Sequence, residues 1–162
     1  MLRDREVTMN DELKDHLPTI IATFAIGIAA CAFALLQVYN NAGAMNVDMF
    51  SMAVWVVPCV FMVICSFVIM VTANAIGRKL FLVVVGVCFV AGVIEMVLTS
   101  TWFSNPDIVN ALLANSGDGA EVVPPINNPI AVMRDIAAFI VAPTVGSIFG
   151  AWLGSRLHPM KR

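Results

Sequence analysis

Four long runs of apolar residues dominate the chain, and polar residues are concentrated between them. The runs cover residues 18–39, 51–73, 80–102 and 129–155. Each is long enough to cross a bilayer, which takes about 20 helical residues. The alternating pattern of a membrane barrel is missing, and a backbone in lipid must satisfy its own hydrogen bonds. The pattern therefore predicts an all-α polytopic membrane protein with four transmembrane helices packed as a bundle.

Composition supports this class of protein. Of the 162 residues, 60% are hydrophobic and 12% are charged, and the mean hydropathy is +0.89. Soluble domains are nearer half apolar and a quarter charged, and a domain of this size cannot bury so much apolar surface. The net charge of −2 and the absence of a basic stripe argue against nucleic-acid binding.

Lysine and arginine residues lie on one side of the predicted spans. The two connections at 40–50 and 103–128 contain none, whereas the other segments outside the spans carry Arg3, Arg5, Lys14, Arg78, Lys79, Arg156, Lys161 and Arg162. Cytoplasmic loops are enriched in these residues. We therefore expect a plasma (inner) membrane protein with a cytoplasmic tail at 1–17, a transmembrane domain at 18–155 and a basic cytoplasmic tail at 156–162.

The segments outside the spans contain helix start and stop patterns. Asn10 resembles the cap of a short surface helix that runs toward Pro18. In the outer loop at 103–128, Asn105 followed by proline predicts a short helix, which the glycines at 117 and 119 should end. Asn128 and Pro129 should begin the last span in the same way.

The last span carries small residues at every fourth position. Gly146, Gly150 and Gly154 continue a row formed by Ala138 and Ala142. Such a row lets helix backbones approach closely, which drives helix association in lipid. The row predicts packing either within one bundle or between subunits. The first span is also rich in small residues, so we expect it to be the partner.

Three ionisable residues lie inside the predicted spans at a similar depth. Glu95 lies in the third span, and Arg134 and Asp135 lie near the outer end of the fourth. An isolated charge in the membrane costs at least ~2.5–3.5 kcal/mol. We therefore predict an ion pair between Glu95 and Arg134, with Asp135 and Gln37 as neighbours.

The helix face that carries Glu95 is small and polar and should turn inward. Its members at helical spacing are Cys88, Gly92, Thr99 and Trp102. This cluster suits a substrate or ion site or a proton-handling carboxylate, and equally a structural clasp between helices. An ion pair with Arg134 would keep Glu95 ionised, which argues against a simple proton-coupled exporter.

Cysteine, methionine and histidine provide few further candidates. The four cysteines lie within spans and form no C-x-x-C pair, so we expect free, buried thiols at Cys31, Cys59, Cys65 and Cys88. Thioethers suit Cu(I), and the first outer connection contains Met45, Met49 and Met52. Methionine is also ordinary membrane filler, so we predict no metal site. The histidines lie outside the helix interiors where haem ligands are usual, and we expect no cofactor.

These patterns favour a transporter or channel protomer, or an accessory subunit of a membrane complex. Its expected partners are the lipid bilayer and either further copies of the chain or other membrane subunits, not nucleic acid. A membrane-embedded aspartic-type hydrolase is an alternative in which Asp107 and Asp135 would share a proton, although the adjacent Arg134 argues against it. A purely structural subunit and copper handling also remain open.

Overall fold

The computed structural model describes residues 2–72 and 77–157, and this part of the chain is helical without a strand. Its five α-helices are α1 (Leu2–Asn40), α2 (Val47–Thr72), α3 (Gly77–Ser100), α4 (Pro106–Ala114) and α5 (Pro129–Leu157). Four segments are long and apolar enough to cross a membrane, namely His16–Asn40, Val47–Thr72, Leu80–Ser104 and Pro129–Leu157. The prediction of an all-α chain with four candidate spans is confirmed.

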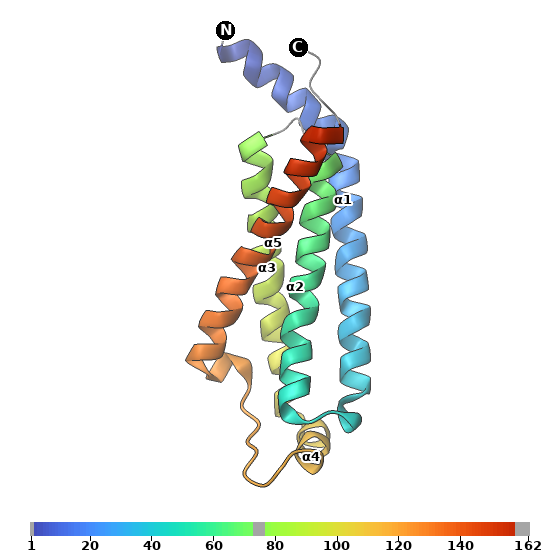
Figure 1. Ribbon diagram of the computed structural model, residues 1–162, viewed down its shortest axis with the longest axis vertical. Helices are drawn as coiled ribbons and strands as arrows, with labels where there is room; N and C mark the ends of the chain where they lie inside the picture. Colours follow the sequence, from blue (N-terminus) through green and yellow to red (C-terminus); the bar gives the residue numbers. More distant parts are fainter. Residues whose placement is uncertain (1, 73–76, 158–162) are drawn as a thin grey trace.

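The four long helices lie side by side, and α1 begins at the end of the bundle where α5 finishes (Figure 1). Helix α1 is already helical before Asn10 and continues through Pro18. The predicted cap at Asn10 is therefore wrong. A proline removes one backbone hydrogen bond, and a long helix can tolerate that loss with a local bend.

Helix α2 is the central packing element. It has its most extensive interface with α5, packs against α1 and has a smaller contact with α3, which lies mainly against α5. The expected pairing of the first and last spans is therefore wrong, because among the described residues α5 lies on α2 and α3. Pro58 and Pro143 are buried inside α2 and α5, and both helices continue through them.

Two glycines of the predicted row let α5 approach the backbone of α2. A Cβ atom added at Gly150 would lie 2.5 Å from the carbonyl oxygen of Phe67, and one at Gly146 would collide with Ser66 and the carbonyl of Val63. Gly154 is also buried, whereas Ala138 and Ala142 are half-buried. Close backbone contact of this kind supplies dispersion energy where lipid offers no hydrophobic drive.

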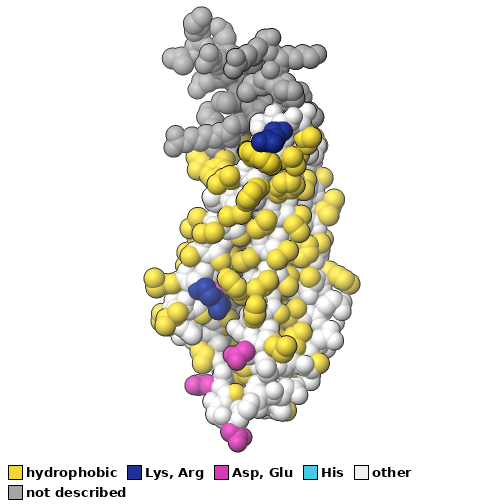
Figure 2. Space-filling view, viewed as in Figure 1, with side chains coloured by type: hydrophobic (Ala, Val, Ile, Leu, Met, Phe, Trp, Pro, Cys, Tyr) yellow, Lys and Arg dark blue, Asp and Glu magenta, His cyan; other side chains and the backbone are white. Residues whose placement is uncertain are grey.

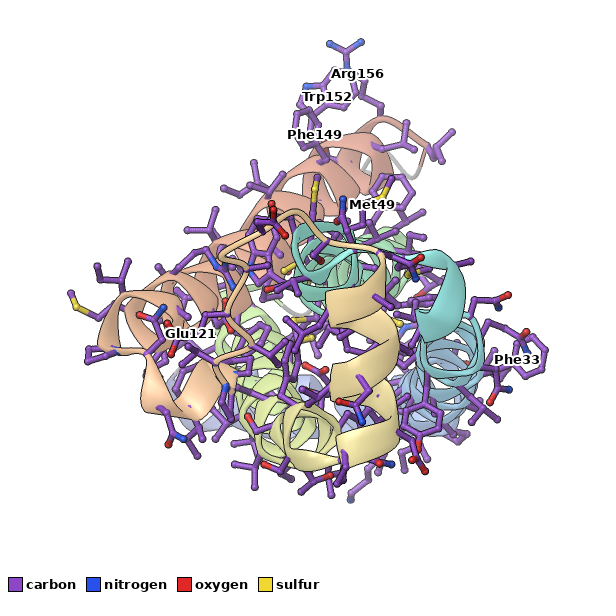
Figure 3. The ribbon with its side chains drawn as sticks, turned by 90° about the horizontal axis from the view of Figure 1, so that it is seen from below. Phe33, Met49, Glu121, Phe149, Trp152 and Arg156 are labelled. Carbon is purple, nitrogen blue, oxygen red and sulfur yellow. The ribbon has the colours of Figure 1, made fainter. Side chains whose placement is uncertain are left out.

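The loop between α3 and α5 folds over one end of the bundle. Asn105 caps α4 by accepting a hydrogen bond from the Asp107 amide at 3.0 Å, and its own amide group donates to the Tyr39 hydroxyl at 3.1 Å. Asn128 caps α5 by accepting from the Ile130 amide at 3.0 Å. Both predicted caps are confirmed. Figure 3, which looks onto this end, shows α4 crossing it with α1 on one side and α5 on the other.

Charged side chains are sparse along the bundle and differ between its ends. Hydrophobic side chains cover the visible length of the bundle, and acidic side chains gather near the end that carries α4 (Figure 2). The described acidic residues at that end are Asp48, Asp107, Asp118 and Glu121. Phe149, Trp152 and Arg156 of α5 point outward, away from the bundle (Figure 3). A surface of this kind is suited to lipid contact along its length.

Candidate functional site

A crevice of about 390 Å³ lies between α1, α2 and α3. Its walls are apolar and include Phe24 and Leu35 of α1, Phe61 and Met62 of α2, and Ala91 of α3. The crevice exists because α1 and α3 both pack against α2 but have no extensive interface with each other. Its volume falls in the range of small-molecule sites, which is about 300–1,000 Å³.

The predicted polar face of α3 supplies the polar part of this crevice. Cys88, Glu95, Thr99 and Trp102 all line it. Gly92 is buried on the side of α3 that meets α5, where an added Cβ would lie 2.6 Å from the ring of Phe139. Trp102 lies toward the end that carries α4 and packs edge-on against Tyr39, with ring centroids 5.0 Å apart. The prediction that this face turns into the bundle is confirmed.

Glu95 has a buried carboxyl oxygen without a partner. Its Oε1 atom is shielded from solvent and makes no hydrogen bond. The hydroxyl of Thr99, one turn further along α3, donates to the backbone carbonyl of Glu95 at 3.0 Å. No described lysine or arginine lines the crevice. A buried polar atom left unpaired costs about 1–3 kcal/mol, and more when the group is charged.

Arg134 pairs with Asp135 and not with Glu95. Its Nε and Nη2 atoms both lie 2.8 Å from Asp135 Oδ1. The guanidinium also lies over the ring of Trp55, 5.0 Å from the centroid. The predicted Glu95–Arg134 ion pair is therefore wrong. Residues one apart on a helix point about 100° apart, but the long arginine side chain bridges that angle.

The three ionisable groups nevertheless occupy neighbouring positions around α2. Cys59 of α2 lies within electrostatic range of Glu95, Arg134 and Asp135, and the two carboxyl groups are close enough to interact with each other. The Asp135 side chain is 6% exposed, whereas that of Arg134 is 43% exposed. These three residues supply two carboxyl groups and one guanidinium group. Because the guanidinium is bonded to Asp135, Glu95 has no cationic partner among the described residues.

Two other sets of candidate residues lie away from the crevice. Gln37 is exposed near the end of α1 and is absent from the crevice lining, so its prediction as a neighbour of Glu95 is wrong. Met45 packs against the apolar cluster under α4, whereas Met49 and Met52 are 61% and 62% exposed. The structure thus separates the half-buried Met45 from the exposed Met49 and Met52.

All four cysteines are free, as predicted, but only Cys65 and Cys88 are buried, whereas Cys31 and Cys59 are half-buried. Cys31, Cys65 and Cys88 come from three different helices and line the crevice, whereas Cys59 lines a groove on another side of α2. Among the described residues no group of three or more His, Cys, Asp or Glu side chains is arranged to hold a metal ion. The sequence did not predict that these thiols converge, because their convergence depends on which helices are neighbours.

The carboxyls considered for a hydrolase lie in different environments. Asp107 is exposed in the first turn of α4, whereas Asp135 is buried in α5 and bonded to Arg134. An aspartic dyad needs two carboxyls that share one proton. The described geometry does not favour that chemistry.

Comparison of the chain with protein-family models, with curated proteins and with solved structures gives no significant match.

Proposed function

We propose that this chain is a protomer of a membrane transporter and that the crevice beside Glu95 is its substrate site. The observation that carries the proposal is the Glu95 side chain, which lines a crevice with apolar walls while its shielded Oε1 atom has no hydrogen-bond partner. An ionisable group inside a membrane span is costly, so it is generally retained for a function or offset by a partner. Here the candidate partner, Arg134, is bonded to Asp135.

The corrected ion pairing supports transport over a structural clasp at Glu95. A clasp needs a hydrogen bond or ion pair from Glu95 to another helix, and Oε1 makes none. A carboxyl without a permanent partner can gain and lose one during a transport cycle. The pairing expected from the sequence would have prevented this exchange.

The proposal places the protein in the plasma membrane, with both termini in the cytoplasm and several copies in one assembly. The distribution of lysine and arginine over the sequence supports the orientation. The even number of candidate spans agrees with termini on one side. An assembly is proposed because four helices enclose little space for a path across the membrane.

The experiment is an accumulation assay in cells that produce either the wild-type chain or Glu95→Gln at equal membrane levels. The test compounds should be small, with a mainly hydrocarbon body, and the set should include cationic, neutral and anionic members. We expect the wild-type chain to change the accumulation of at least one class, and Glu95→Gln to change none. The exposed loop residue Asp118 provides the matched control, because Asp118→Asn also removes one carboxylate and should behave as wild type.

Two outcomes would contradict the proposal. One is a wild-type chain that changes the accumulation of no compound relative to cells without it. The other is a Glu95→Gln variant that transports as well as the wild type, because the substrate site would then not depend on the carboxyl.

A further inference from the structure

We infer that the crevice binds an amphiphilic organic cation, with its apolar body between α1 and α3 and its positive centre against Glu95. This inference rests on the proposed function and adds the chemical class of the substrate. It begins from the uneven distribution of polar groups in the crevice. Glu95 and Thr99 lie close together on α3, whereas the facing walls are built from apolar side chains and thiols.

The polar end of the crevice is short of positive charge. The Thr99 hydroxyl donates to the backbone carbonyls of Glu95 and Met96 at 3.0 Å and 3.4 Å, and the same neutral hydroxyl lies close to the Glu95 carboxyl without supplying a charge. Arg134 directs two nitrogen atoms at Asp135. A ligand with one positive centre would give Glu95 the missing partner, and a charge-assisted contact is stronger than a neutral one.

The apolar part of the crevice favours an organic cation over a metal ion. Metal ions such as Mg²⁺ and Ca²⁺ require several oxygen ligands, and Glu95 is the one carboxylate among the described lining residues. Aromatic rings of Phe24, Phe61 and Trp102 line the same crevice. Such rings attract quaternary ammonium groups through their electron-rich faces.

The packing of the helices indicates that the ligand arrives from the lipid. Trp102 and Tyr39 are in contact near the end that carries α4, and α4 crosses that end (Figure 3). The gap between α1 and α3 has no extensive helix interface across it. An amphiphilic cation that partitions into the bilayer can therefore reach Glu95 from the side.

The experiment compares two compounds of the same shape and different charge. Benzyltrimethylammonium carries one positive centre, and neopentylbenzene is its neutral carbon isostere. Binding of each isotope-labelled compound is measured on the full chain in nanodiscs, with empty nanodiscs as the background. We expect the cation to bind the wild-type chain about tenfold more tightly than the neutral compound, because its positive centre makes an ion contact with the Glu95 carboxylate that the carbon isostere lacks.

Three variants test where the cation binds. Glu95→Gln should remove the preference for the cation and leave the weak binding of the neutral compound unchanged. Ala91→Phe should fill the crevice from α3 and weaken both, and Ala32→Phe should do the same from α1 if the first variant folds poorly. Asp118→Asn should bind as wild type.

Several results would overturn the inference. If both compounds bind equally and Glu95→Gln has no effect on their binding, the crevice is an apolar site and the cation inference fails, whereas the accumulation assay with Glu95→Gln decides the proposed transport function. If neither compound binds more to the wild type than to the filled variants, the inference also fails, and the accumulation assay decides the proposed function separately. Cross-linking of Cys31 to a second copy would show that another chain occupies the crevice, which also contradicts the inference.

Discussion

Three ionisable side chains in the spans have different structural roles. Asp135 is buried and bonded to Arg134, and Arg134 is partly exposed and lies over Trp55. Glu95 faces the crevice with one oxygen unpaired. These surroundings predict that loss of the Arg134–Asp135 pair destabilises the fold, whereas replacement of Glu95 by its amide does not.

We expect Arg134→Gln to lower the free energy of unfolding by about 1.5–3 kcal/mol, because it removes the charged partner of a buried carboxylate. The double variant with Asp135→Asn should recover part of this loss, because no buried carboxylate is then left without its partner. Thermal unfolding in mild detergent, arranged as a double-mutant cycle, measures the coupling between the two residues. Purely additive effects would contradict the ion pair.

We expect Glu95→Gln to leave the stability of the fold unchanged or slightly higher. The wild-type Oε1 atom makes no hydrogen bond that the substitution could break, and the amide lacks the desolvation cost of a carboxylate. The same unfolding measurement checks this result, with Asp118→Asn as the control for loss of charge. A clear loss of stability in Glu95→Gln alone would support a structural clasp and oppose the transport proposal.

At the scale of the elements, the contact between α2 and α5 depends on the absence of side chains at two positions. Gly146 and Gly150 lie against the backbone of α2, whereas an added Cβ at Gly86 of α3 meets nothing within 4 Å. Replacement of glycine by alanine therefore has different consequences in α5 and in α3.

We expect Gly146→Ala and Gly150→Ala each to destabilise the chain by about 1–3 kcal/mol, because a methyl group forces the two helices apart. Gly86→Ala should be neutral or stabilising, because it removes a flexible residue from a helix without a clash. The free energies of unfolding of the three variants, measured in the same detergent, test this prediction. Equal stability of all three would mean that α2 and α5 do not approach as closely as described.

Apart from the cap at Asn10, the local features of the elements could be predicted from the sequence, whereas contacts between elements could not. The caps at Asn105 and Asn128 and the inward face of Glu95 follow from residue type and helical spacing. The pairing of Arg134 depends on a side-chain conformation, and helical spacing alone argues against neighbours on one helix. Which helix packs against the glycine row of α5 depends on how all four long helices are arranged. The sequence pattern of a single helix does not determine that arrangement.

At the scale of the whole molecule, α1 begins and α5 ends at the same end of the bundle, opposite α4 (Figure 1). The end that carries α4 has acidic side chains, and the lysine and arginine residues of the sequence other than Arg134 lie in the other connection and the two tails. This asymmetry predicts one orientation in the membrane.

We expect a fluorescent protein fused to the C-terminus to be fluorescent in the cytoplasm. A phosphatase that is active only outside the cytoplasm should be active when inserted at Asp118, in the loop that follows α4. The control is the reciprocal pair of fusions, with the phosphatase at the C-terminus and the fluorescent protein inserted at Asp118. Phosphatase activity at the C-terminus, with none in the loop, would reverse the orientation.

The crevice also requires the whole bundle, because three helices build it and α5 holds the arginine that would otherwise be a partner for Glu95. The central claim is that a bound organic cation is the ionic partner of the Glu95 carboxyl group. Infrared difference spectroscopy of the full chain in lipid tests this claim most directly. Benzyltrimethylammonium should shift a carboxyl band that is missing in Glu95→Gln, and neopentylbenzene should leave the band unchanged. A cation that leaves the Glu95 band unchanged, or an equal shift with the neutral isostere, would contradict the account.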